Sequence, residues 1–220
     1  TLNGIELAQV GRVLRATSVV VRFFDDLEKD ELTLKALPDL VAQLVTLPQL
    51  TEKIRSSVAD DGAVLDTAST KLRGLRTGLK QLEGQIRSRM ASYTHGAKAK
   101  YLSDPIVTIR NDRYVIPVKQ EYRGQFGGVV HDQSASGQTL FMEPQAIMEL
   151  NNRLRQLQIE EQQEIERILA ELSEAIMPER HNILANAELL GQLDFVNAKA
   201  QLAKALKATE PLINLENHVE

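Results

Sequence analysis

The chain has 220 residues, 43% of them hydrophobic and 25% charged, which is typical of one or two soluble domains. It has no cysteine, which excludes disulfides and cysteine-based metal sites, and no apolar run near the roughly 18 residues that span a membrane. We therefore expect a cytoplasmic location and no membrane partner. The net charge of −4 argues against nucleic-acid binding over the whole surface.

The N-terminal third predicts a helical base. Asn3 is expected to cap a helix running to about Asp26, and prolines open two short helices at Pro38–Val45 and Pro48–Val58. The sequence begins at Thr1 without methionine, so we expect a piece of a longer protein.

Two long helices are predicted at Ser69–Tyr93 and Pro144–Ile176, because apolar residues recur three and four positions apart in both. Antiparallel pairing would place Leu79 opposite Ile165 and Ile86 opposite Leu157, so that paired residue numbers add to about 243. Cations on the first helix face glutamates on the second. Residues 64–100 carry an excess of six positive charges.

Glycines interrupt the first long helix, each at a cost of about 1 kcal/mol relative to alanine. Gly74 and Gly78 share one face. This indicates either close packing against the base or flexibility, and we favour packing.

Between the two helices lies a segment with β-branched residues, alternation and paired glycines. It predicts four short antiparallel strands: Ile106–Arg110, Arg113–Lys119, Gly128–Ser134 and Gln138–Met142. Asn111-Asp112 suits the first hairpin turn. The predicted fold is mainly α with a small inserted antiparallel β domain: a helical core with a long antiparallel two-helix lever, carrying a β-rich clamp at its tip.

A final helix from about Glu179 to Lys207 is expected to pack on the base. The predicted organisation has four segments: the core and outgoing lever helix (1–100), the clamp (101–143), the returning lever helix and core (144–210), and the start of a linker (211–220).

Catalytic chemistry is not expected in this segment. The sequence has no GxxxxGK[ST] phosphate loop, and its four histidines lack the pairing of a zinc site. His131, Asp132 and Ser134 are the residue types of a hydrolase triad, but neighbouring strand residues point to opposite faces. We predict no catalytic residue, no metal site and no cofactor site.

The inserted segment is better interpreted as a binding tip. It combines cations with short amide and hydroxyl side chains, a mixture that suits phosphate backbones. Few aromatic residues accompany them, so base reading is not expected. The alternative is that these residues are simply solvated on a small sheet. The candidate nucleic-acid-binding residues are Lys98, Lys100, Arg110, Asn111, Arg113, Lys119, Arg123, Gln133, Ser134, Ser136 and Gln138.

The stretch YLSDPIVTIRNDRYVIPVKQEYRGQFGGVVHDQSASGQTLFMEPQAIMELNNRLRQLQIEEQQEIERIL resembles the clamp and returning lever of the MutS family. DGAVLDTASTKLRGLR and AELLGQLDFVNAKAQLAKAL extend the resemblance over most of the chain. The similarity is greatest to the second bacterial MutS paralogue, which lacks the mismatch-reading and connector domains.

The resemblance implies an ATPase domain that uses ATP and Mg²⁺ and forms a homodimer, followed by a Smr endonuclease domain, both outside this chain. It also implies that the clamp contacts nucleic-acid backbone. The expected partners are branched or duplex DNA, in suppression of homologous recombination and DNA repair, or the ribosome and its rRNA, in rescue of collided ribosomes. An alternative from another class is a structural coiled-coil stalk whose tip contacts a protein.

Overall fold

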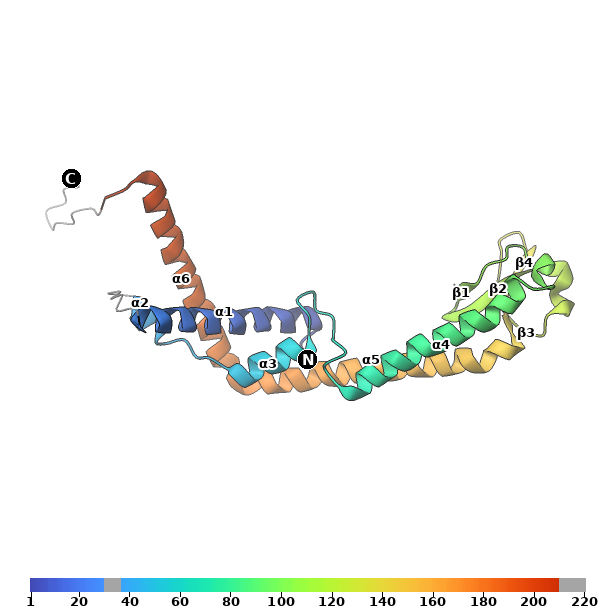
Figure 1. The fold of residues 1–220 in the computed structure, drawn as a ribbon, viewed down its shortest axis with the longest axis horizontal. Coiled ribbons are helices and arrows are strands. Elements are labelled where there is room, and N and C mark those ends of the chain that lie inside the picture. The colour runs from blue at the N-terminus through green and yellow to red at the C-terminus, as the bar shows by residue number, and fades with distance from the viewer. Residues whose placement is uncertain (30–36, 210–220) are drawn as a thin grey trace. The chain divides into compact units, whose positions relative to one another are not determined.

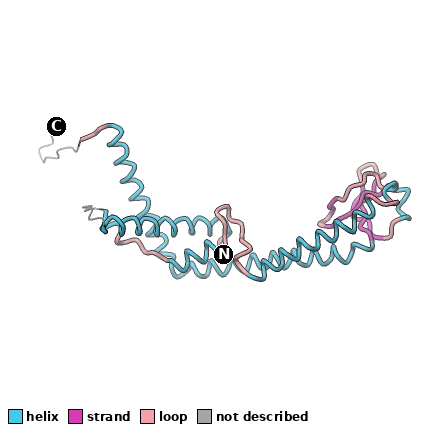
Figure 2. Tube along the Cα trace, in the orientation of Figure 1, coloured by secondary structure: helices cyan, strands magenta, loops and turns pink. Residues whose placement is uncertain are grey.

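The structure is a computed structural model that describes residues 1–29 and 37–209. Figures 1 and 2 show its elements, which confirm a mainly helical chain with a small antiparallel sheet. The predicted linker at 211–220 lies outside the described residues. The chain forms two compact units, one made of Thr1–Leu65 and Leu169–Glu220 and the other of Asp66–Ile168. In chain order the helices and strands are α1 (Gly4–Lys29), α2 (Leu37–Val41), α3 (Pro48–Ser57), α4 (Thr70–Thr94), η1 (Ala99–Tyr101), β1 (Thr108–Arg110), β2 (Arg113–Lys119), η2 (Gln120–Gln125), β3 (Gly128–Gln133), β4 (Thr139–Pro144), α5 (Gln145–Ile176), η3 (Met177–Glu179) and α6 (Arg180–Leu206).

The first unit is helical, as its sequence predicts. α1 begins with a capping box, in which Asn3 Oδ1 accepts from Glu6 N at 2.9 Å and Glu6 Oε2 accepts from Asn3 N at 2.8 Å. α1 packs against α2, α3 and α6. The fully buried Asn186 of α6 exchanges two hydrogen bonds with the backbone of Val45. This amide therefore ties α6 to the chain that follows α2.

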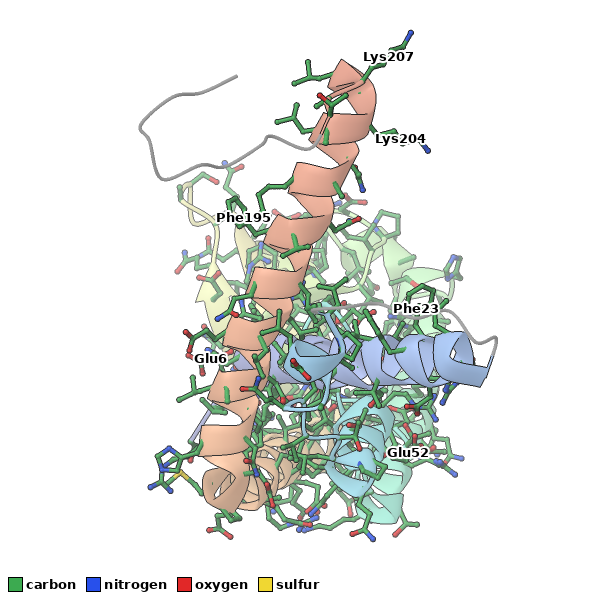
Figure 3. The ribbon with its side chains drawn as sticks, turned by 90° about the vertical axis from the view of Figure 1, so that its left-hand side faces the viewer. Glu6, Phe23, Glu52, Phe195, Lys204 and Lys207 are labelled. Carbon is green, nitrogen blue, oxygen red and sulfur yellow. The ribbon has the colours of Figure 1, made fainter. Side chains whose placement is uncertain are left out.

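Only the N-terminal half of α6 packs as predicted. Ile183, Asn186 and Leu189 are buried, whereas Phe195 and Leu206 are 64% and 69% exposed. The physical reason is that α6 crosses α1 and continues past it, as Figures 1 and 3 show. The expected packing of the final helix on the base is therefore confirmed for its N-terminal half and not for the rest.

The second unit is a two-helix stem that ends in the sheet. α4 and the first part of α5 lie side by side (Figure 1), and the strand order is β1-β2-β4-β3, antiparallel throughout. Ile86 and Met90 of α4, Ile116 of β2, Met142 of β4 and Ile147 of α5 share one buried cluster. The sheet is therefore held to the stem by a common core.

The first hairpin turn is confirmed. Asn111 and Asp112 have positive φ angles of 51° and 59°, the backbone of a type I′ turn, which Asn and Asp tolerate better than most residues. It joins β1 to β2, where Arg110 pairs with Arg113.

The register of the stem differs from the predicted one. A Cβ on Gly78 would lie 3.2 Å from Leu157 Cδ1, and Arg89 Nη1 donates to Ala146 O at 3.3 Å. Contacting residues therefore add to about 235 and not to about 243. Ile86, the predicted partner of Leu157, lies eight residues, or about 12 Å, further along α4 than Gly78, the observed neighbour of Leu157.

Helical apolar repeats explain why the prediction failed, because shifting one helix by about one heptad again places apolar residues opposite apolar residues. Polar contacts distinguish the two registers. Ser69 Oγ donates to Glu164 Oε1 at 2.8 Å, and Arg76 Nε donates to Glu161 Oε1 at 2.7 Å. Both contacts exist only in the observed register.

Candidate nucleic-acid interface

The predicted binding residues separate into two groups, at opposite ends of strand β2. The Arg113 end holds the β1–β2 turn, with Arg110, Asn111 and Arg113. At the Lys119 end, Lys119 pairs with Thr139 of β4, Lys119 Nζ donates to Lys100 O, and Gln120 N donates to Gln138 O. The Lys119 end thus collects residues from η1 and the position before it, from the end of β2, from η2, and from the end of β3 with the turn that follows it: Lys98, Lys100, Lys119, Arg123, Gln133, Ser134, Ser136 and Gln138.

The cations at the Arg113 end form ion pairs with carboxylates of the same sheet. Arg113 Nη1 lies 2.8 Å from Glu143 Oε1, and Arg110 Nε lies 3.1 Å from Asp132 Oδ2. The Arg110 guanidinium also lies 4.1 Å from the centre of the Phe141 ring. Asn111 Nδ2 donates to His131 O at 3.0 Å. These three predicted residues therefore hold the sheet together.

Glu143 is the centre of the contacts at this end, and no prediction from the sequence concerned it. Its carboxylate is 1% exposed and contacts Arg113, His131 Nε2 at 2.6 Å and Asn151 Nδ2 at 2.7 Å. Asn151, also buried, bonds the backbone N–H and C=O of Tyr114. The network therefore joins β2, β3 and β4 to α5. The available signal was a glutamate between Met142 and Pro144, at the apolar end of a predicted strand.

Cations at the Lys119 end are arranged differently. Within residues 1–29 and 37–209, Lys98, Lys100, Lys119 and Arg123 form no ion pair. Lys98 Nζ lies 5.3 Å from the centre of the Phe126 ring, and Lys100 Nζ lies 5.0 Å from that of Tyr101. The aromatic rings thus support the lysine side chains without neutralising their charge.

A hollow of about 760 Å³ opens at the Lys119 end. Its lining combines one cation and one carboxylate with amide and hydroxyl groups. Ser103 Oγ and Thr139 Oγ1 lie 2.8 Å apart there. The lining residues are Ser103, Lys119, Gln120, Glu121, Gln138 and Thr139.

The hydrolase residue types do not form a relay. His131 contacts Glu143 and Asp132 pairs with Arg110, so the two side chains have separate partners. In the described ranges, no three His, Asp or Glu side chains are grouped so that they could hold a metal ion. Likewise, no helix of the described residues is long and apolar enough to cross a membrane.

Known proteins resemble the chain over its whole length. It is 95% identical over 219 residues to Endonuclease MutS2 of Latilactobacillus sakei subsp. sakei, covering 100% of this chain and 28% of that protein. Proteins of the same name from Lacticaseibacillus paracasei and Enterococcus faecalis are 57% and 56% identical over 218 residues, again covering 99% of this chain and 28% of theirs. No protein-family model matches the sequence.

A helical base, a two-helix stem and an inserted four-stranded sheet, together with these matches, place the chain in the MutS family. Within that family its relatives are MutS2 proteins, and it corresponds to one segment of them. The chain spans 28% of the length of these relatives.

Proposed function

We propose that the Lys119 end of the sheet binds the phosphate backbone of nucleic acid without reading its sequence. One observation carries this proposal: the cations at this end form no ion pair among the described residues, whereas Arg110 and Arg113 at the other end are paired. Unpaired cations release bound counterions from a phosphate backbone, which is the main source of non-specific affinity.

The neighbouring side chains suit backbone contact better than base contact. Ser134, Ser136 and Gln138 supply hydroxyl and amide groups that can position phosphates. At this end Phe126 is buried and has no free ring face on which a base could stack, and the half-buried rings of Tyr101 and Tyr122 pack against each other with 4.8 Å between their centres.

The relatives' printed name leads us to propose DNA as the polymer, because an endonuclease acts on nucleic acid. In this proposal residues 101–143 act as a clamp, and cleavage and ATP hydrolysis belong to parts of the parent protein outside this chain. The parent would be a cytoplasmic homodimer acting on branched DNA in recombination. Ribosomal RNA offers the same phosphate chemistry and is a separate arm of the test.

The test is charge reversal at the tip, with Lys119→Glu and Arg123→Glu combined. The control is Arg22→Glu with Lys204→Glu, two exposed cations of the first unit that form no ion pair in the described chain. We expect the tip variant to bind duplex and four-way-junction DNA at least about tenfold more weakly than the control, with a smaller salt dependence.

An rRNA hairpin measured alongside shows which polymer binds more tightly. Equal DNA and RNA affinities of the tip variant and the control would contradict the proposal. That result would favour a structural stalk whose tip contacts a protein.

A further inference from the structure

Three cations recur at heptad spacing along α4. Arg73, Lys80 and Arg87 are all exposed, and we call them the basic stripe. At about 1.5 Å per residue, neighbours along the stripe are about 10.5 Å apart, and the stripe turns only about 20° per heptad around a straight helix. The three charges therefore lie along one side of the stem.

The basic stripe differs from the other cations near its start. Lys71 pairs with Glu164, and Arg76 pairs with Asp66 and Glu161. In the part of the chain that the structure describes, no ion pair involves Arg73, Lys80 or Arg87.

The charges of Arg73 and Lys80 in the basic stripe affect the pKa of a nearby carboxyl group, that of Asp66. The pKa of the Asp66 carboxyl is held below its usual value, first by its hydrogen bond from Arg76 and to a smaller extent by the charges of Lys80 and Arg73. The field of these cations therefore reaches an anion beside the helix.

Small side chains accompany the charges. Thr77, Gly84 and Ala91 each follow a stripe cation by four residues, which places them on the same side of the helix. Nothing lies within 4 Å of a Cβ built on Gly84. A protein helix docked here would find no large apolar side chain among these three residues, so burial would contribute little. Electrostatic attraction remains, and it is strongest for a polymer with one charge per about 1.7 Å.

We infer that the basic stripe is a second contact for the phosphate backbone of a nucleic-acid duplex, along the stem. This inference rests on the proposed function of the Lys119 end. Lys98 and Lys100 follow the end of α4 by four and six residues, so cations without an ion pair in the described chain continue from the stem to the tip. A duplex is stiff over the length of the stem, because its persistence length is about 150 base pairs.

The test neutralises the stripe in the full 220-residue chain with Arg73→Gln, Lys80→Gln and Arg87→Gln. The control, Arg22→Gln, Lys199→Gln and Lys204→Gln, removes the same charge from exposed positions in the first unit; Figure 3 shows Lys204 pointing away from α6. The probe is a labelled random-sequence duplex of about 30 base pairs, titrated from about 50 mM salt upward. We expect the stripe variant to bind about tenfold or more weakly than the control, with a salt slope smaller by about 2 to 3.

A positional readout uses the absence of native cysteine. Duplex should slow maleimide labelling of Thr77→Cys on the stripe side, and leave unchanged that of Gln192→Cys, an exposed position in the first unit.

The outcomes separate the two proposals. If the Lys119/Arg123 variant loses affinity and the stripe variant matches its control, the proposed duplex contact of the basic stripe is wrong, whereas the proposed binding site at the Lys119 end is supported. If only the stripe variant loses affinity, the tip assignment fails. No duplex binding by the unmodified chain at about 50 mM salt overturns both. Equal protection of Thr77→Cys by poly-glutamate would overturn the choice of nucleic acid.

Discussion

His131 Nε2 lies 2.6 Å from Glu143 Oε2, and the opposite oxygen of the same carboxylate accepts from Arg113. One buried carboxylate thus joins a residue of β3 to a residue of β2. Asn151 of α5 completes the set. The orientation of the sheet on the stem depends on these contacts, since the apolar core around them is not directional.

Replacing Glu143 by alanine should destabilise the second unit by about 3 kcal/mol, because Arg113 and His131 would lose their shared partner in a poorly solvated place. All four tyrosines of the chain lie within Asp66–Ile168, so tyrosine fluorescence during urea unfolding reports on this unit alone. Glu149→Ala, an exposed change on α5, should cost about 0.5 kcal/mol or less. Equal midpoints for the two variants would show that the network contributes no stability.

Asn151→Ala should cost about 2 kcal/mol, because the buried N–H and C=O of Tyr114 would both lose their partner. The adjacent Asn152 provides the matched control: it is exposed and accepts one hydrogen bond from Arg113. Asn152→Ala should cost about 1 kcal/mol or less. Hydrogen exchange at the Tyr114 amide should accelerate in the first variant only, and unchanged exchange there would refute the role given to Asn151.

Elements with a local signal could be predicted from the sequence, and contacts between distant residues could not. Ser69 caps α4, Asn111-Asp112 makes the first turn, and β2 spans the predicted residues, because caps, turns and alternation act over a few positions. The register of α4 on α5 could not be predicted because two registers satisfy the same apolar pattern. Arg113 forms an ion pair with Glu143, whereas Lys119 has no ionic partner in the described chain. The residue types alone could not predict this difference, because it depends on which side chains the folded sheet brings next to each cation.

The glycines of α4 should respond unequally to alanine. Gly84 has open space at its Cβ position, so Gly84→Ala should stabilise the stem by about 0.5–1 kcal/mol, the helix-propensity difference. At Gly78 the new methyl group would lie 3.2 Å from Leu157 Cδ1, which must move, so the gain should be smaller. Gly78→Leu should destabilise the unit by about 1–3 kcal/mol through overpacking. Thermal unfolding monitored by tyrosine fluorescence should rank the variants from most to least stable as Gly84→Ala, Gly78→Ala and Gly78→Leu. Destabilisation by Gly78→Leu would also support the observed register of α4 on α5.

Stability of the stem should fall at acid pH through Glu164. Its hydrogen bond from Arg167, with further contributions from Ser69 and Lys71, lowers the pKa of the Glu164 carboxyl from 4.5 to about 2. A carboxyl whose pKa is lower in the folded than in the unfolded state stabilises the fold fully above the unfolded value, and this stability is lost as the pH falls from about 4.5 to about 2.

Because Arg167 and Lys71 are more than half exposed, solvent screening limits the effect to about 1–2 kcal/mol. Urea midpoints of the unmodified chain and Glu164→Gln should differ at pH 6 and converge near pH 2. Glu166→Gln, at an exposed position two residues away, should follow the unmodified chain throughout. A constant difference between the chain and Glu164→Gln across this range would show that the carboxylate contributes nothing through its charge.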